Sequence, residues 1–145
     1  MTWPTPRPGL VIRYSYLWRR EAEQGREEGV KDRPCAIILA VRQDQGDDKV
    51  FVLPITHSAP AIPADAVELP LAVKRRLGLD DAPSWVVLSE TNGFLWPGPD
   101  LRPPPGRPPD EAAYGFLPPS LFAQIRDRFL ERLRRRQASI VSRSD

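Results

Sequence analysis

Arg33 is a residue whose type and position could support chemistry. It directly precedes the apolar run 34–41, and a continuous run of this kind is typical of a strand buried on both faces. We therefore expect its guanidinium to be held at the end of a rigid strand while it still reaches solvent. A guanidinium fixed in this way suits bidentate binding of a phosphate. The alternative is an edge arginine that only pairs with a nearby carboxylate.

Thr56 and His57 are the next candidates, at the end of the following apolar run. The polar segment 43–48 predicts a hairpin turn between the two runs. Pairing across that turn places Arg33 and Thr56 at the same end of a sheet, within about 10 Å, because adjacent strands lie ~4.8 Å apart. A hydroxyl can donate to a phosphate oxygen, and histidine, with an unperturbed pKa of about 6.5, can transfer protons at neutral pH. The alternative is that the Thr-His pair only forms a turn.

Strand patterns dominate the elements that must position these side chains. Apolar, β-branched and aromatic residues predict strands at 10–18, 34–41, 49–56, 67–69 and 84–90. Because short turns join most of them, they favour a mainly β fold, a small and strongly bent antiparallel barrel of about five to seven strands. Pro54 lacks an N–H and indicates an edge or a bulge near the end of its strand.

Two helices are expected beside the strands. Residues 71–77 fit one or two turns closed by Gly78, and the prolines at 118–119 predict a C-terminal helix that runs to about residue 137. Apolar residues at three- and four-residue spacing give this second helix one buried stripe. They are Leu121, Phe122, Ile125, Phe129 and Leu133. The charged segment 19–28 allows either a short helix or a loop.

The whole chain, residues 1–145, is expected to form a single domain. The segment 97–109 holds seven prolines, which predicts an extended surface loop or, alternatively, a ligand for a proline-binding domain. Residues 138–145 are expected to fray.

Composition argues against several classes of protein. The 145 residues are 41% hydrophobic and 28% charged, with a net charge of +2. No apolar stretch is long enough to span a membrane and no secretory signal pattern is present, so we expect a cytoplasmic protein. One cysteine and one histidine allow neither an intrachain disulfide nor a structural zinc site, and we expect no metal and no cofactor. A glycine-rich phosphate loop is also absent, which argues against nucleotide-cofactor folds.

Several short motifs together resemble the MazF/PemK family of toxins from toxin–antitoxin systems. Each motif is short, but they occur jointly and in the family's order over roughly residues 8 to 135. The matching segments are Pro8-Gly9-Leu10-Val11-Ile12, Lys31-Asp32-Arg33-Pro34, Val52-Leu53-Pro54-Ile55-Thr56, Val86-Val87-Leu88-Ser89-Glu90 and 114–122.

The resemblance implies an SH3-like barrel of the plasmid-maintenance-toxin type that forms a homodimer and binds a cognate antitoxin. It also implies metal-independent cleavage of single-stranded RNA, in which the arginine of Arg-Pro and the threonine of Pro-Ile-Thr act together. These are Arg33 and Thr56. A glutamate of the preceding loop contributes in some members, and Glu28 lies at a comparable place. Since the neighbouring 2′-OH is the nucleophile, the protein needs to stabilise charge and move protons, for which Glu28 or His57 is suited.

The sequence departs from the family pattern at four places. The charged first loop is longer, His57 stands where a serine is commoner, Gly93 stands near an arginine of many members, and the proline-rich segment is not typical. These departures leave the RNA sequence preference open. They also allow an inactive member, or a barrel that only binds a protein, as does the related gyrase-poisoning toxin CcdB.

Aromatic and cationic residues supply candidates for RNA contacts. Single-stranded RNA is commonly bound by aromatic rings on which bases stack. The candidates are Tyr14, Tyr16, Trp18 and Phe94, with the cations Arg19 and Arg20 beside them; core positions are the alternative for the rings. The C-terminal helix is rich in arginine, which fits a solvated face, an acidic antitoxin segment or RNA phosphate. These arginines are Arg126, Arg128, Arg132, Arg134, Arg135 and Arg136.

Overall fold

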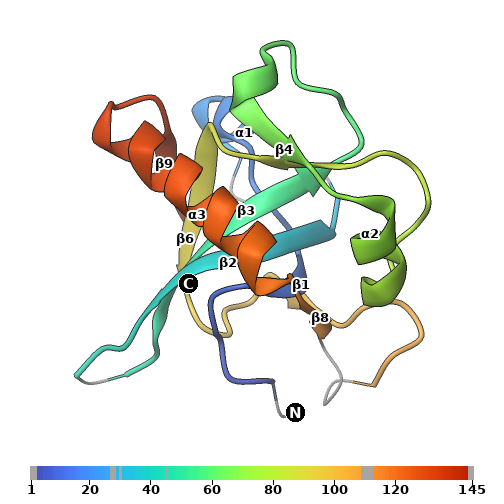
Figure 1. The fold of residues 1–145 in the computed structure, drawn as a ribbon. Helices are drawn as coiled ribbons and strands as arrows, with labels where there is room; N and C mark the ends of the chain where they lie inside the picture. The colour runs from blue at the N-terminus through green and yellow to red at the C-terminus, as the bar shows by residue number, and fades with distance from the viewer. Residues whose placement is uncertain (1–2, 27–28, 30, 45, 109–112, 144–145) are drawn as a thin grey trace.

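The fold has more residues in strands than in helices (Figure 1). The computed structural model describes residues 3–26, 29, 31–44, 46–108 and 113–143. In chain order the elements are β1 (Leu10–Tyr14), α1 (Arg19–Glu23), β2 (Arg33–Val41), β3 (Lys49–Thr56), the 3-10 helix η1 (Pro63–Asp65), β4 (Ala66–Glu68), α2 (Leu71–Leu77), β5 (Trp85–Val87), β6 (Glu90–Leu95), β7 (Leu101–Arg102), β8 (Ala113–Phe116), α3 (Pro119–Arg134) and β9 (Ser139–Ser142).

The strand β2 lies at the centre of the sheet, as its continuous apolar run predicts. It pairs antiparallel with β1 on one side and with β3 on the other. Its side chains enter two separate cores: Ala36 and Ile38 enter one, and Cys35 and Ile37 enter the other. The predicted hairpin between β2 and β3 is confirmed, and it brings the start of β2 beside the end of β3.

The strand β3 has two different neighbours along its second edge. Residues of its first half pair with β6, whereas Ile55 and Thr56 pair with β5. Pro54 lies at the change of partner, where its missing N–H costs no ladder hydrogen bond to either neighbour. The single strand expected at 84–90 is therefore two strands, because β5 and β6 pair with different parts of β3.

The sheet is mainly antiparallel and open. Its strands follow the order β4-β5-β3-β2-β1-β7, with β6 and β9 branching from β3 and β8 pairing with β1. Among the pairings of the described residues, none joins the two ends of this order. The mainly β fold with a C-terminal helix is thus confirmed, and the closure expected of a barrel is not.

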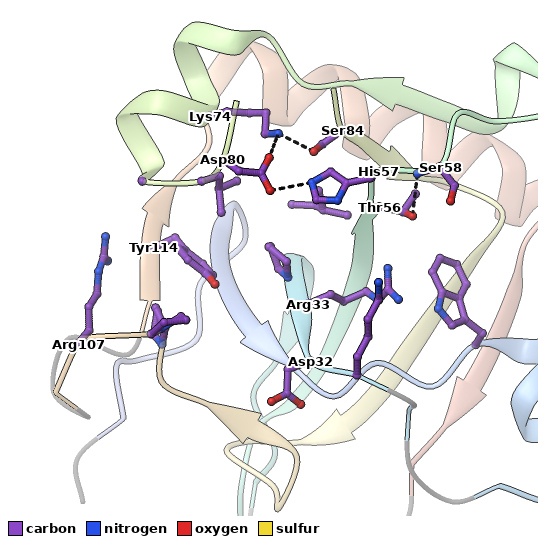
Figure 2. A pocket seen from close by; sticks show the side chains of 18 of the residues that line it. Asp32, Arg33, Thr56, His57, Ser58, Lys74, Asp80, Ser84, Arg107 and Tyr114 are labelled. Carbon is purple, nitrogen blue, oxygen red and sulfur yellow. Dashed lines mark hydrogen bonds and ion pairs between the residues drawn. The ribbon is translucent and has the colours of Figure 1, made fainter. Parts of the chain in front are cut away.

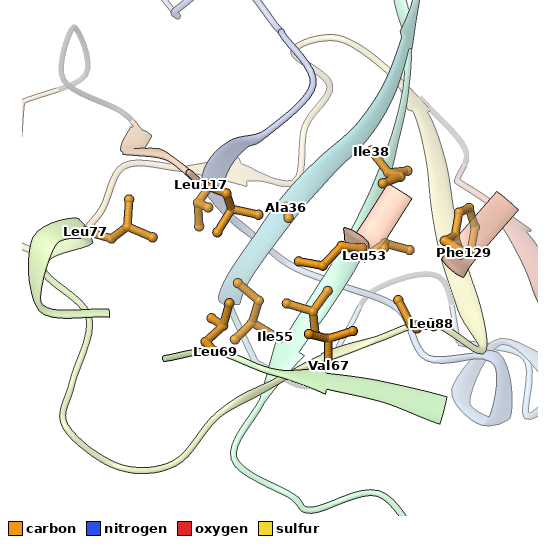
Figure 3. Packing of buried hydrophobic residues seen from close by; sticks show 13 residues of the cluster. Ala36, Ile38, Leu53, Ile55, Val67, Leu69, Leu77, Leu88, Leu117 and Phe129 are labelled. Carbon is orange, nitrogen blue, oxygen red and sulfur yellow. The ribbon is translucent and has the colours of Figure 1, made fainter. Parts of the chain in front are cut away.

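One face of the sheet carries α3, which lies across it in Figure 1. The predicted stripe is confirmed, since Ile125 and Phe129 are buried in the same core cluster as Ala36, Ile38 and Leu53 of β2 and β3. Figure 3 shows Phe129 in this cluster. Burial of one such side chain stabilises a fold by about 1.5–3 kcal/mol. The helix α2 also agrees with the prediction. It is capped by Gly78, whose φ of 74° is accessible to glycine with little strain and is strained for other residues.

The C-terminal segment does not fray, contrary to the expectation for residues 138–145. After α3, Arg136 adopts a φ of 59° and the chain turns back, so that β9 pairs in parallel with β6. Arg143 follows β9 and is buried, with its guanidinium donating to Ser15 O at 2.6 Å and to Asn92 Oδ1 at 3.1 Å and lying 2.9 Å from Asp100 Oδ2. We call Arg143 with these three partners the C-terminal latch. Residues 144–145 lie outside the described part.

The proline-rich segment is more closely attached to the fold than a surface loop. Its residues Leu101 and Arg102 form β7, which pairs with β1, and Asp100 and Leu101 are buried. The segment therefore contributes to the core and to the latch through its described residues, 97–108.

Candidate active site

A cleft of about 670 Å³ opens where β2 begins and β3 ends (Figure 2). Its walls come from parts of the chain that are distant in sequence: α1, the start of β2, the end of β3, α2 with the loop that follows it, and the proline-rich segment. Five predicted site residues line it: Trp18, Arg20, Arg33, Thr56 and His57.

Arg33 and Thr56 lie opposite each other across the hairpin. The register pairs Cys35 with Pro54, and two residues further along both strands it places Arg33 opposite Thr56. Directly opposed residues of antiparallel strands have Cα atoms about 4.5–5.5 Å apart, with side chains on the same face. The hairpin thus brings these two side chains into one cleft, as the sequence predicted.

The Arg33 guanidinium is held in place but not neutralised. Its Cζ lies 5.0 Å from the centroid of the Trp18 ring, and Arg20 lies over the same ring at 5.3 Å. Arg33 Nε is buried without a hydrogen-bond partner, and no carboxylate of the described residues pairs with this guanidinium. Burial lowers the pKa of Arg33, but an arginine remains protonated at neutral pH. A partly buried cation with unused donors is suited to an anionic ligand.

Asp32 precedes Arg33 and would be the nearest carboxylate in sequence. It is used elsewhere, since its Oδ2 lies 3.7 Å from Arg13 and 3.9 Å from Arg102. The alternative that Arg33 is an ordinary paired edge arginine therefore finds no support in the part of the chain that the structure describes.

The Thr56 hydroxyl is oriented by a local hydrogen bond. The backbone N–H of Ser58 donates to Thr56 Oγ1 at 3.2 Å (Figure 2). Because the hydroxyl oxygen accepts this bond, its own proton remains available for donation to a ligand.

His57 follows the last residue of β3 and also faces the cleft, because strand alternation ends at Thr56. Its Nε2 lies 2.8 Å from Asp80 Oδ2, and Asp80 Oδ1 lies 2.7 Å from the Nζ of the buried Lys74. The hydrogen bond from Lys74 holds the pKa of the Asp80 carboxyl below its usual range. Asp80 is therefore an ionised acceptor at neutral pH, between a lysine and the imidazole (Figure 2).

No motif or spacing in the sequence indicates this His57–Asp80–Lys74 cluster. Asp80 lies in the loop after α2, and only the return of that loop toward β5 brings it to His57. Lys74 belongs to a helix whose sequence would place a lysine in solvent, yet its side chain is 2% exposed. Contacts of this kind depend on tertiary packing rather than on spacing along the chain.

Three of the predicted RNA-stacking rings lie in the core instead. Tyr14, Tyr16 and Phe94 are at most 1% exposed and pack in the same core cluster. Tyr14 of β1 and Phe94 of β6 point to the inner face, and Tyr16, just after β1, is buried with them, so these rings offer no surface to a base. Trp18 is the candidate ring that reaches the cleft.

Of the remaining predicted site residues, some reach the cleft and others do not. Arg19 is turned away from the cleft, with Nε 2.9 Å from Glu23 Oε1 and NH1 donating to Ser139 Oγ. Its role as an RNA contact is therefore not supported by its position. Glu28 lies outside the described residues. Arg20 remains at the cleft.

The proline-rich segment forms the far wall of the cleft through Pro104, Pro105 and Arg107. Arg107 NH1 donates to Ala113 O at 2.7 Å, and its guanidinium lies 5.8 Å from the ring of Tyr114. The cleft is thus cationic at both ends, with Arg33 and Arg20 at one and Arg107 at the other.

The arginines of α3 contact either the neighbouring 3-10 helix η1 or carboxylates of α3 itself. Arg128 and Arg132 donate to Ala64 O, and Arg132 also pairs with Asp65 at 2.6 Å. Arg134 and Arg135 pair with Glu131 of the same helix, and Arg126 pairs with Asp127. This agrees with a helix whose charged face is solvated and locally balanced.

Within the described residues there is no group of three or more His, Cys, Asp or Glu side chains able to hold a metal ion. The described helices are also too short or too polar to cross a bilayer. Comparisons of the chain with protein-family models, with curated proteins and with solved structures found no match.

Proposed function

We propose that this protein is a metal-independent endoribonuclease that cleaves single-stranded RNA in the cleft at the ends of β2 and β3. The observation that carries the proposal is the Arg33 guanidinium, which pairs with no carboxylate of the described residues and lines the same cleft as Thr56, the residue opposite it across the hairpin. The two groups together match the needs of one phosphodiester: a cation for its oxygens and a neutral donor beside it.

The reaction uses the RNA's own nucleophile. The 2′-oxygen attacks the adjacent phosphorus, the new O2′–P bond forms, and the P–O5′ bond breaks. His57 accepts the 2′-OH proton, and the leaving 5′-oxygen takes a proton from water. Arg33 and Thr56 donate to the phosphoryl oxygens, on which negative charge increases in the transition state. The products are a 2′,3′-cyclic phosphate and a 5′-hydroxyl.

The resemblance to MazF/PemK toxins supports the same activity from the sequence side. Under this proposal the open, mainly antiparallel sheet is a variant of the SH3-like barrel. A homodimer and a cognate antitoxin are then the expected protein partners. Trp18 and Arg20, beside Arg33, would contact the RNA.

The test is incubation of the purified protein with a defined single-stranded RNA in the presence of EDTA. We expect cleavage that leaves cyclic-phosphate and 5′-hydroxyl ends. A matched substrate with deoxyribose at the cut position is expected to stay intact, because it lacks the nucleophile. Cleavage of the deoxy substrate, or cleavage only when Mg²⁺ is added, would contradict the mechanism. Binding of RNA without cleavage would favour a barrel that only binds its partner.

A further inference from the structure

We infer that Asp80, anchored by Lys74, positions His57 so that Nδ1 of the imidazole is the atom that accepts the proton in the cleft. The catalytic consequence of this inference rests on the proposed function. The arrangement of Lys74, Asp80 and His57 is independent of that function. It concerns two residues, Asp80 and Lys74, that no motif in the sequence indicates.

Lys74 is a rigid anchor. Its ammonium group has three donors, and all three are used: by Asp80 Oδ1 at 2.7 Å, by Ser84 Oγ at 2.7 Å and by Ala82 O. With its side chain 2% exposed, it cannot turn toward solvent without breaking all of these contacts. The loop that carries Asp80 is therefore tied to α2.

Asp80 is oriented by this anchor. Its Oδ1 accepts from Lys74 and from the backbone N–H of Ala82 at 3.1 Å, which leaves Oδ2 to face His57 at 2.8 Å. An ionised carboxylate has no proton to donate, so the His57 nitrogen that faces it must carry one. Asp80 thus fixes the neutral imidazole with its proton on Nε2.

The second ring nitrogen is then the reactive one. With Nε2 protonated, Nδ1 holds a lone pair, and no described residue hydrogen-bonds it. His57 lines the same cleft as Arg33 and Thr56. When Nδ1 takes the 2′-OH proton, the imidazolium is stabilised by the Asp80 carboxylate, as in hydrolases whose carboxylate sets the histidine tautomer.

The substitution Asp80→Asn tests this arrangement directly. The asparagine oxygen can still accept from Lys74 and Ala82, which leaves its NH₂ group to face His57 Nε2. A donor at this place reverses the requirement: Nε2 becomes the acceptor and the proton moves to Nδ1. Asp81→Asn is the matched control, because Asp81 is the next residue and pairs only with the exposed Arg75 among the described residues.

The tautomer can be measured without any activity. The chain has one histidine, so the imidazole signals in ¹H–¹⁵N spectra are unambiguous. At about pH 8.5, where an ordinary histidine is neutral, we expect the Nε2–H tautomer in the wild-type protein and in Asp81→Asn. Asp80→Asn is expected to show the Nδ1–H tautomer, and Asp80→Ala a mixture. An unchanged tautomer in Asp80→Asn, or Nδ1–H in the wild type, would overturn the inference.

The kinetic arm measures the consequence on RNA. We expect Asp80→Asn to lower kcat about tenfold or more with little change in KM, at the low end of the effects known for residues that orient a histidine. Adding Asp80→Asn to His57→Gln should cost little more than His57→Gln alone, since Asp80 acts through His57. Additive losses would overturn this role. If the wild type leaves RNA intact, the proposed function fails, while the spectra still decide the positioning.

Discussion

Of the arginines that lie against aromatic rings, Arg143 and Arg33 have opposite surroundings. Arg143 is 5.3 Å from the ring of Tyr14 and Arg33 is 5.0 Å from the ring of Trp18. The Arg143 side chain is 1% exposed and contacts a carboxylate, an amide oxygen and a backbone carbonyl. Arg33 is half-buried, and its Nε has no partner among the described residues.

The difference separates a structural cation from a ligand-binding one. A buried guanidinium with a complete set of partners connects the segments that supply them, and it has nothing left to offer a ligand. A guanidinium held by a ring but without a counter-charge keeps its donors available at a cost in desolvation. We therefore expect changes in the C-terminal latch to alter stability, and changes in the cleft to alter activity.

The largest expected effect is on the latch. Arg143→Ala should lower the free energy of unfolding by about 3–5 kcal/mol, because it removes one member of a buried ion pair, Arg143 with Asp100 at 2.9 Å. Urea denaturation measures the change, with the exposed Arg135→Ala as the control. A loss no larger than that of the control would show that the C-terminal strand contributes little to the fold.

In the cleft we expect a substitution to lower activity strongly and to change stability little. Arg33→Ala should lower the rate of RNA cleavage by about a hundredfold or more, the scale expected for loss of a donor to transition-state charge. Its free energy of unfolding should change by less than about 1 kcal/mol, since the change removes a cation–π contact with Trp18 and breaks no ion pair among the described residues. Measuring both quantities on one preparation makes the comparison with Arg143→Ala direct. Full activity in Arg33→Ala would remove the distinction between the two arginines.

A smaller loss is expected at Thr56, which supplies one neutral donor. Thr56→Val keeps the β-branched shape of the strand end but removes the hydroxyl, so cleavage should slow by about fivefold, equivalent to ~1 kcal/mol. Thr56→Ser keeps the hydroxyl and is the control. Equal rates for the valine variant and the wild type would show that Thr56 does not contact the reacting phosphate.

The smallest effect concerns pH and stability at the edge of the cleft. Lys74 lowers the pKa of the Asp80 carboxyl relative to the unfolded chain. A lowered pKa stabilises the fold above the unfolded value of about 4, and this contribution is lost as pH falls through the folded pKa. The melting temperature of Asp80→Asn should therefore fall less steeply with acid than that of the wild type or of Asp81→Asn. Identical pH profiles would contradict the Lys74–Asp80 contact in solution.

The parts of the fold that local pattern determines could be predicted. The apolar run of β2, the polar turn after it and the stripe of α3 each depend on spacing within one segment. The same spacing placed Arg33 opposite Thr56, because a hairpin fixes which ends meet.

The parts that depend on distant contacts could not be predicted. β9 is short and polar at both ends, and it is stabilised by pairing with β6 and by Arg143, neither of which has a local signal. Asp80 reaches His57 only through the return of the loop after α2. From residue type alone, Tyr16 and Phe94 fit an RNA-binding surface as well as they fit a core. In the structure both pack in the core.

The latch also sets an order of events during synthesis of the chain. Arg143 donates to a carbonyl 128 positions earlier, at Ser15, and it is the counter-charge of Asp100. A ribosome delivers Ser15, Asn92 and Asp100 well before Arg143, so the nascent chain lacks the latch contacts and the pairing of β6 with β9 until residues 139–143 emerge. Contacts of such long sequence separation form late and slow folding. The fold is therefore completed only after residue 143 has been synthesised, and a chain interrupted before this point lacks the latch.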